Sequence, residues 1–155
     1  MNWTFNDGGR AAAGYTGAAG DCATRAVAIA TGLPYEAVYR AINRLATRER
    51  SGSRKRGRSN AREGVFKATM QRLMQALGWG WTPTMGIGTG CRVHLRAAEL
   101  PGGRLIAAVS KHYVAVVDGT VRDTHDPSRD GTRCVYGYWT RTPTMPEVPI
   151  EEVGA

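Results

Sequence analysis

The sequence predicts a single α+β domain, residues 1–155, in which helices come first and an antiparallel sheet follows. Apolar residues in the first half recur at the three- and four-residue spacing of helices. In the second half they form short β-type runs separated by turn residues. Hydrophobic residues make up 42% of the 155-residue chain and charged residues 22%, which is enough apolar material for one core. Helices in one half and an antiparallel sheet in the other define the α+β class.

The expected elements begin after a Gly- and Ala-rich segment, residues 1–20, which favours turns over regular structure. Asp21 is a suitable N-cap, and Gly32 stands where a glycine commonly ends a helix. The residues between them are small and apolar on almost every side, so this first helix is expected to be buried.

Two further helices are predicted from apolar stripes. The second helix opens at Leu33-Pro34, with proline at its first position. The third covers about residues 64–77 and ends at Gly78. The stripes are formed by Tyr35, Val38, Ile42 and Leu45 in the second helix and by Phe66, Met70, Leu73 and Leu77 in the third.

The second half is predicted to be mainly β-structure. Residues 79–90 are rich in glycine and are expected to form a loop. Asp118-Gly119, between two β-type runs, is a strong hairpin signal. The Pro-rich tail, residues 142–155, is expected to fray. The predicted strands are residues 104–109, 113–117, 120–124 and 133–139.

The basic charge is concentrated in one segment. The formal net charge is +8, and residues 40–62 hold nine basic side chains and one acidic side chain, so the rest of the chain is neutral. Residues 48–63 are expected to form a basic, mobile loop, because apolar anchors are missing there. Such a loop favours non-specific binding of a nucleic-acid backbone or an acidic protein, although a solvated loop explains the charge equally well. The residues expected to make these contacts are Arg54, Lys55, Arg56 and Arg58.

The cysteines and the apolar runs bear on compartment and cofactors. Three widely spaced cysteines, Cys22, Cys91 and Cys134, are neither a disulfide framework nor a zinc site. No apolar run approaches the roughly 20 residues of a membrane helix, and the N-terminus lacks the pattern of a secretory signal. We therefore expect a reducing, cytoplasmic setting, no membrane contact, and no metal or organic cofactor.

Cys22 is the first candidate for chemistry, because it would occupy the first turn of the buried helix. Free backbone N–H groups and the helix dipole at that position stabilise a thiolate and lower the pKa of the thiol. The same N–H groups can stabilise a developing oxyanion. The alternative is that Cys22 is a small buried hydrophobic residue, which is a common fate of a free cysteine.

A cysteine nucleophile also needs a proton acceptor, and histidine is the usual one. His112 stands at the entrance of a predicted strand, where a side chain is held rigidly and can face a cleft. His94 alternates with apolar residues, and His125 lies between Asp123 and Asp126. A structural role remains the alternative for each histidine.

The hairpin offers an acid that could orient His112. In a two-residue turn at Asp118-Gly119, His112 lies opposite His125 and Asp123 shares its face. A bulge or a longer turn would instead bring Asp126 opposite His112, with Pro127 ending the strand. The sequence does not decide between them; Asp126 is the preferred acid and Asp123 the alternative. Both are also common turn formers.

Three short blocks resemble papain-like cysteine proteases, and more narrowly the small bacterial, plasmid- and phage-borne proteins related to double-glycine (bacteriocin-processing) peptidases. The blocks are Gly20–Ala26 (GDCATRA), Lys111–Gly119 (KHYVAVVDG) and Asp123–Ser128 (DTHDPS). That family has a nucleophilic cysteine at the start of a buried helix, a histidine at the start of a strand, and an acid or asparagine after the next strand. The resemblance thus implies a papain-like fold with Cys22, His112 and Asp126 as the catalytic residues.

One position departs from the family pattern. Papain-like enzymes usually place a glutamine about six residues before the cysteine, where its side chain donates a hydrogen bond to the oxyanion. Here that position is Thr16. The expected oxyanion hole is therefore the backbone N–H of Cys22 with Thr16. Loss of one such donor commonly costs about a hundredfold or more in rate.

These observations lead to two functional hypotheses. The first is a cysteine hydrolase that cleaves a peptide or isopeptide bond in a peptide or protein substrate through an acyl-enzyme. Deamidation and acyl transfer use the same groups. The second is a non-catalytic papain-like fold that binds nucleic acid or an acidic protein through its Arg-rich loop.

Overall fold

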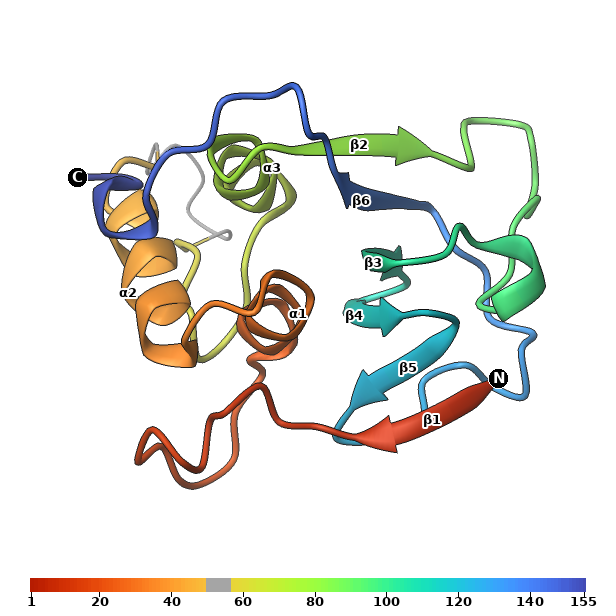
Figure 1. The fold of residues 1–155 in the computed structure, drawn as a ribbon, viewed down its shortest axis with the longest axis horizontal. Coiled ribbons are helices and arrows are strands. Elements are labelled where there is room, and N and C mark those ends of the chain that lie inside the picture. The colour runs from red at the N-terminus through yellow and green to blue at the C-terminus, as the bar shows by residue number, and fades with distance from the viewer. Residues whose placement is uncertain (50–56) are drawn as a thin grey trace.

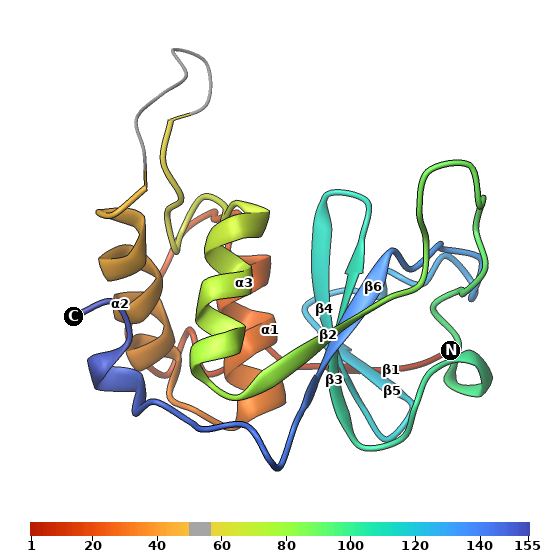
Figure 2. The same ribbon diagram turned by 90° about the horizontal axis from the view of Figure 1, so that it is seen from above.

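A computed structural model describes residues 1–49 and 57–155 and shows a mixed α+β architecture. Within these residues, three α-helices lie on one side of a six-stranded mixed sheet (Figure 1). Figure 2 shows the same separation from above, with the helices beside the sheet. The α+β prediction is confirmed at this level. No helix in the described residues is long and apolar enough to cross a membrane.

All three predicted helices form, but the third begins at Lys67 and not near residue 64, and the side chain of Asp21 makes no capping hydrogen bond. Helix α1 (Cys22–Thr31) ends at Gly32, whose left-handed backbone (φ 77°) lets its N–H bond to the carbonyl of Ala28. Eight of the ten residues of α1 are buried, because α2 packs on one side of it and strands of the sheet on the other. The other two helices are α2 (Tyr35–Ala46) and α3 (Lys67–Ala76).

The sheet has the order β1-β5-β4-β3-β6-β2. All neighbouring strands are antiparallel except β1 and β5, which are parallel. Only the antiparallel part was predicted. The strands are β1 (Asn2–Phe5), β2 (Trp79–Pro83), β3 (Arg104–Val109), β4 (His112–Val117), β5 (Thr120–Asp123) and β6 (Gly137–Arg141).

The hairpin between β4 and β5 has the tight two-residue turn that its sequence indicates. Val117 pairs with Thr120. Asp118 and Gly119 have positive φ angles of 48° and 78°, as a type I′ turn requires. This register fixes which residues of β5 can reach the start of β4.

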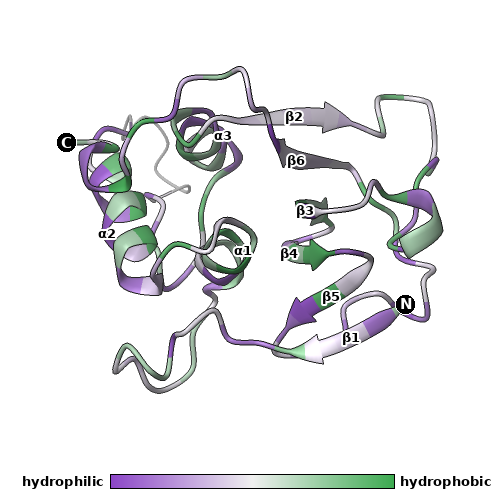
Figure 3. Ribbon diagram, viewed as in Figure 1, coloured by the Kyte–Doolittle hydropathy of each residue, from purple (hydrophilic) through white to green (hydrophobic). Residues whose placement is uncertain are grey.

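Apolar residues cover both faces of the sheet. Between the helices and the sheet, Val27 and Ile42 pack with Ile106 and Trp139. On the opposite face, residues of the segment between β2 and β3 pack on the sheet, including the fully buried Leu95. In Figure 3, β4 in the middle of the sheet is strongly hydrophobic, whereas α2 carries both hydrophobic and hydrophilic residues. Strand β4 is therefore a rigid base for the residues at its ends.

Three strand assignments from the sequence are wrong. Residues 2–5 form β1, although they lie in the segment expected to be irregular. The sequence did not indicate this strand because all four residues are exposed, Trp3 and Phe5 included, so no alternation of buried and exposed residues marks it. Residues 79–83 form β2, not a loop. The last strand begins at Gly137, four residues later than expected, because Arg133 and Val135 form backbone hydrogen bonds with Leu95 and Val93.

The C-terminal tail does not fray. Ile150 and Val153 are buried in the core beside α2. The guanidinium group of Arg44 on α2 donates to the carbonyl oxygens of both residues, at 2.8 and 3.0 Å. The two apolar anchors outweigh the prolines that suggested a loose end.

The expected basic loop is anchored at its C-terminal end. Ser59 and Ala61 are buried, and Ala61 accepts a hydrogen bond from Thr24 and donates one to Asn43. Residues 59–61 are thus fixed against α1 and α2, contrary to the expectation of a mobile loop through residue 63. Arg58 is exposed. Arg54, Lys55 and Arg56 lie outside the described residues.

Gly137 offers a direct test of the β2–β6 packing. A Cβ atom at this position would lie 2.2 Å from the Trp81 ring. We expect Gly137→Ala to lower the free energy of unfolding by about 1–3 kcal/mol, because a fixed ring must move. Gly102→Ala is the control, since nothing lies within 4 Å of a Cβ there. Urea unfolding that shows equal stability for both variants would contradict this packing.

Candidate active site

Cys22 is the first residue of α1 and lines a cleft of about 1090 Å³ between the helices and the sheet. It is the free cysteine of the chain. One side of the cleft is formed by Ala19, Gly20 and residues 63–65, and the other by residues of the sheet and its loops. The side chain of Cys22 is partly exposed, so its sulfur is accessible from this cleft.

The other two cysteines form a disulfide, which their spacing in the sequence did not predict. Cys91 and Cys134 are bonded, with 5.8 Å between their Cα atoms. They lie on two segments that run side by side, since His94 and Cys134 form a β-bridge. The cysteine count therefore no longer supports a reducing compartment.

His112 is the first residue of β4 and follows the Ser110-Lys111 turn, in which Lys111 has a φ of 57°. Its Nε2 atom lies 2.6 Å from Oδ2 of Asp123, at the end of β5. Both side chains are largely buried. With Nε2 engaged by the carboxylate, Nδ1 is the ring nitrogen left for a proton exchange with another group.

The His112 ring has a second partner, Cys22. The sulfur of Cys22 is a hydrogen-bond partner of the His112 ring and of the backbone N–H of Tyr113. The structure thus brings Cys22, His112 and Asp123 together, although ninety residues separate the cysteine from the histidine in the chain.

These contacts change the proton affinities of the three groups. Burial raises the pKa of the Cys22 thiol, but the hydrogen bonds from His112 and Tyr113 outweigh burial and bring it below its ordinary value of 9.0. Burial lowers the pKa of His112, yet the hydrogen bonds with Asp123 and Cys22 raise it to about 9. Burial also raises the pKa of Asp123, and the His112 contact outweighs that effect and lowers it. Both shifts, a lowered thiol pKa and a raised imidazole pKa, act in the direction of a thiolate–imidazolium pair.

The acid beside His112 is Asp123 and not Asp126, the residue preferred from the sequence. The tight hairpin has no bulge, so the rings of His112 and His125 lie opposite each other, 5.2 Å apart. Asp123 then shares the face of His112, whereas Asp126 lies beyond the end of β5. Asp126 instead accepts a hydrogen bond from the N–H of Ser128, as a turn-forming aspartate does.

Thr16 does not lie in the cleft. It is exposed, and its carbonyl oxygen accepts hydrogen bonds from Arg10 and Arg62. The prediction that Thr16 donates to the oxyanion is therefore wrong. The backbone N–H of Cys22, at the start of α1, remains the candidate donor.

Sequence reasoning missed how Asp123 is held. The N-terminal strand β1 lies beside β5, and the Trp3 indole and the Asn6 backbone N–H both donate to the carbonyl oxygen of Asp123, at 3.1 and 3.0 Å. The side chain of Asp123 also bonds to Arg25 of α1. The sequence did contain one signal for a buried ion pair. Arg25 is a charged residue in a largely apolar helix and stands four residues after Asp21, with which it pairs.

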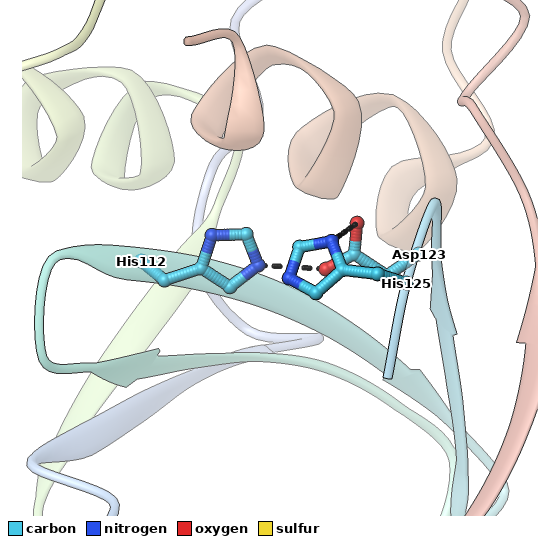
Figure 4. A group of neighbouring side chains, drawn as sticks. All are labelled: His112, Asp123 and His125. Atoms are coloured by element: carbon cyan, nitrogen blue, oxygen red, sulfur yellow. Dashed lines mark hydrogen bonds and ion pairs between the residues drawn. The ribbon is translucent and has the colours of Figure 1, made fainter. Parts of the chain in front are cut away.

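His112, Asp123 and His125 also form the group of side chains in Figure 4, whose potential ligand atoms all lie within 4.8 Å of one another. A metal ion held there would displace the hydrogen shared by His112 and Asp123. It would also approach the guanidinium charge of Arg25, which lies 3.2 Å from the same carboxylate. The arrangement therefore favours a hydrogen-bonded acid–histidine pair over a metal centre.

Large apolar side chains gather at the sheet side of the cleft. Met85, Ile87 and Tyr136 are exposed there, and Ile87 is fully so. Trp81 and Trp139 also line the cleft, with ring centroids 4.3 Å apart and ring planes tilted by 51°. Exposed apolar groups beside a nucleophile are suited to hold an organic substrate.

No family model, curated protein or solved structure matches this chain. The function must therefore be inferred from the geometry of the site.

Replacing each aspartate in turn tests which acid serves His112. Asp123→Asn removes the charge that raises the His112 pKa, so the thiolate of Cys22 loses its cationic partner. We expect alkylation of Cys22 by iodoacetamide at about pH 6 to slow by about tenfold or more. Asp126→Asn is the matched control and should alkylate at the wild-type rate. A larger effect of Asp126→Asn would reverse the assignment.

Proposed function

We propose that this protein is a cysteine hydrolase that acts on a peptide or isopeptide bond through Cys22, His112 and Asp123. The observation that carries the proposal is that the largely buried His112 ring interacts with both Cys22 and Asp123. An acyl-transfer site needs a nucleophile that contacts a base and an acid that orients this base, and Cys22, His112 and Asp123 can take these three roles.

In the proposed mechanism, the Cys22 thiolate attacks the carbonyl carbon of the substrate. The carbonyl oxygen becomes an oxyanion, which the N–H groups at the start of α1 stabilise. As the C–N bond breaks, the His112 imidazolium gives its proton to the leaving amine, and a thioester acyl-enzyme remains. Neutral His112 then takes a proton from water, the resulting nucleophile attacks the thioester, and the acid product leaves. Cys22 returns to thiolate and His112 to imidazolium.

Asp123 has a supporting role in this cycle. Its Oδ2 atom holds Nε2 of His112 at 2.6 Å, which fixes the ring and leaves Nδ1 for the proton exchange with Cys22. The carboxylate also stabilises the imidazolium form. Deamidation and acyl transfer would use the same three residues with a different leaving group or acceptor.

A papain-like fold is part of the proposal. It is supported by the order of cysteine, histidine and acid along the chain, and by a nucleophile at the start of a helix packed on a sheet. The acid–Nε2 contact, which leaves Nδ1 for the sulfur, also agrees with such a site. The apolar side of the cleft suits a peptide substrate with large apolar side chains.

The experiment is hydrolysis of a library of fluorogenic peptide amides, together with labelling by a peptidyl acyloxymethyl ketone. We expect both with the wild-type protein and neither with Cys22→Ala. His112→Ala should reduce kcat by about 10²–10⁴-fold, because proton transfer is lost. The rate should fall above about pH 9, where His112 loses the proton that the leaving amine needs. A folded wild-type protein that neither hydrolyses peptides nor is labelled at Cys22 would refute the proposal.

The nucleic-acid hypothesis rests on the nine basic residues in 40–62 and stays a prediction. If it is right, affinity for double-stranded DNA falls steeply with salt, because bound cations are released from the phosphates. Neutralising Arg54, Lys55, Arg56 and Arg58 together should abolish binding in a filter or fluorescence assay. Undiminished binding after that change would exclude these residues as the contact surface.

A further inference from the structure

Arg25 lies at the centre of a buried charge network beside the proposed active site. It stands in the first turn of α1, three residues after Cys22, and is only 9% exposed. One guanidinium nitrogen bonds to Oδ1 of Asp21, and the other lies 3.2 Å from Oδ1 of Asp123. A planar guanidinium fork can bridge two carboxylates in this way, whereas an ammonium group cannot do so with the same geometry.

The two oxygens of Asp123 have different partners. Oδ2 faces Nε2 of His112 at 2.6 Å, while Oδ1 accepts hydrogen bonds from Arg25 and from the backbone N–H of Thr124, the latter at 2.7 Å. Arg25 and Thr124 together therefore fix the rotation of the carboxylate. That rotation leaves one oxygen for the histidine.

The charge of Arg25 matters most when His112 is neutral. In the proposed reaction His112 gives up its proton to the leaving amine, so during the acyl-enzyme stage Asp123 loses its imidazolium partner. A largely buried carboxylate without a cation tends to take up a proton, and a protonated Asp123 would no longer stabilise the imidazolium. Arg25 is then the cation that remains in hydrogen-bonding contact with Asp123 among the described residues.

We propose that Arg25 is a positioning residue of this site, which keeps Asp123 ionised and turned towards His112 while His112 changes its charge. This inference rests on the proposed function. It adds a fourth residue to the cysteine, histidine and acid, and it gives that residue an electrostatic task distinct from holding α1 in place.

Asp21, the other partner of Arg25, is itself bound from two other parts of the chain. Asp21 accepts a hydrogen bond from the Tyr35 hydroxyl of α2 at 2.6 Å, and Nε of Arg10 lies 3.5 Å from the same carboxylate. The other titratable or charged side chains that face Asp123 or line the cleft are Cys22, His112, Tyr113, His125, Glu63, Lys67, Lys111 and Tyr136. None of these can replace Arg25 without a rearrangement, because none of them is in contact with both Asp21 and Asp123.

The directions of the pKa shifts agree with this role. Arg25 contributes to the lowered pKa of Asp123, after the larger effects of burial, His112 and Thr124. It also contributes directly to the lowered pKa of Cys22, as the last of several causes that begin with burial. Loss of Arg25 should therefore move the ionisation of Cys22 to higher pH.

The experiment measures the rate of Cys22 alkylation by iodoacetamide as a function of pH in Arg25→Met and Arg25→Lys. We expect the acidic limb of the profile to move to higher pH by about one unit in Arg25→Met, so that alkylation below the limb slows about tenfold. Arg25→Lys keeps the charge without the fork and should give an intermediate shift. Arg40→Met is the control, because Arg40 forms an exposed ion pair with Glu36 at the same four-residue spacing.

A second variant separates this electrostatic role from a merely structural one. Asp21→Asn breaks the other ion pair of Arg25 and leaves the Arg25–Asp123 contact. It should therefore lower the thermal midpoint of unfolding with little change in the acidic limb of the alkylation profile. If Arg25→Met fails to fold by circular dichroism, Arg25→Lys carries the test. Folded Arg25 variants with the wild-type acidic limb would overturn the inference. A wild-type Cys22 that alkylates like an ordinary thiol would instead refute the proposed function itself.

Discussion

The contact between His112 and Asp123 is the interaction on which the rest of the site depends. Two largely buried groups lie 2.6 Å apart, and burial alone would drive each towards its neutral form. The ionised form of Asp123 is also favoured by Arg25 and by the backbone N–H of Thr124, which both donate to its carboxylate. The strand β1 adds the Trp3 contact to the same residue. The N-terminus, α1 and the β4–β5 hairpin thus meet at one residue, Asp123, the N-terminus at its backbone carbonyl and α1 at its carboxylate.

The fold explains why a cysteine and a histidine far apart in the chain can meet. Helix α1 is apolar on nearly all sides and is buried against β4, which places the start of the helix beside the start of the strand. Cys22 occupies the first position of one element and His112 the first position of the other. The cleft opens at this junction, so that chemistry, if the proposal is right, takes place where the helical half meets the sheet.

The sequence predicted the parts of the molecule that local patterns determine. The helix end at Gly32, the apolar stripe of α2 and the Asp118-Gly119 turn each depend on residues only a few positions apart in the chain. The structure has all three. The identity of the acid needed the hairpin register and the absence of a bulge, which no local pattern supplies. The Cys91–Cys134 bond, the parallel strand β1 and the anchored tail depend on long-range packing, so spacing alone could not reveal them. The resemblance to papain-like proteases pointed to Cys22 and His112 but misassigned the acid.

The most direct measurement is the titration of His112 by ¹⁵N NMR of the imidazole nitrogens, in the wild-type protein and in Cys22→Ser. A thiolate–imidazolium pair requires both ring nitrogens of the wild-type protein to stay protonated through neutral pH, with a midpoint at about 9. In Cys22→Ser that midpoint should fall, because the serine hydroxyl carries no negative charge. A wild-type midpoint near the ordinary histidine value of 6.5, unchanged in Cys22→Ser, would show that no such pair forms.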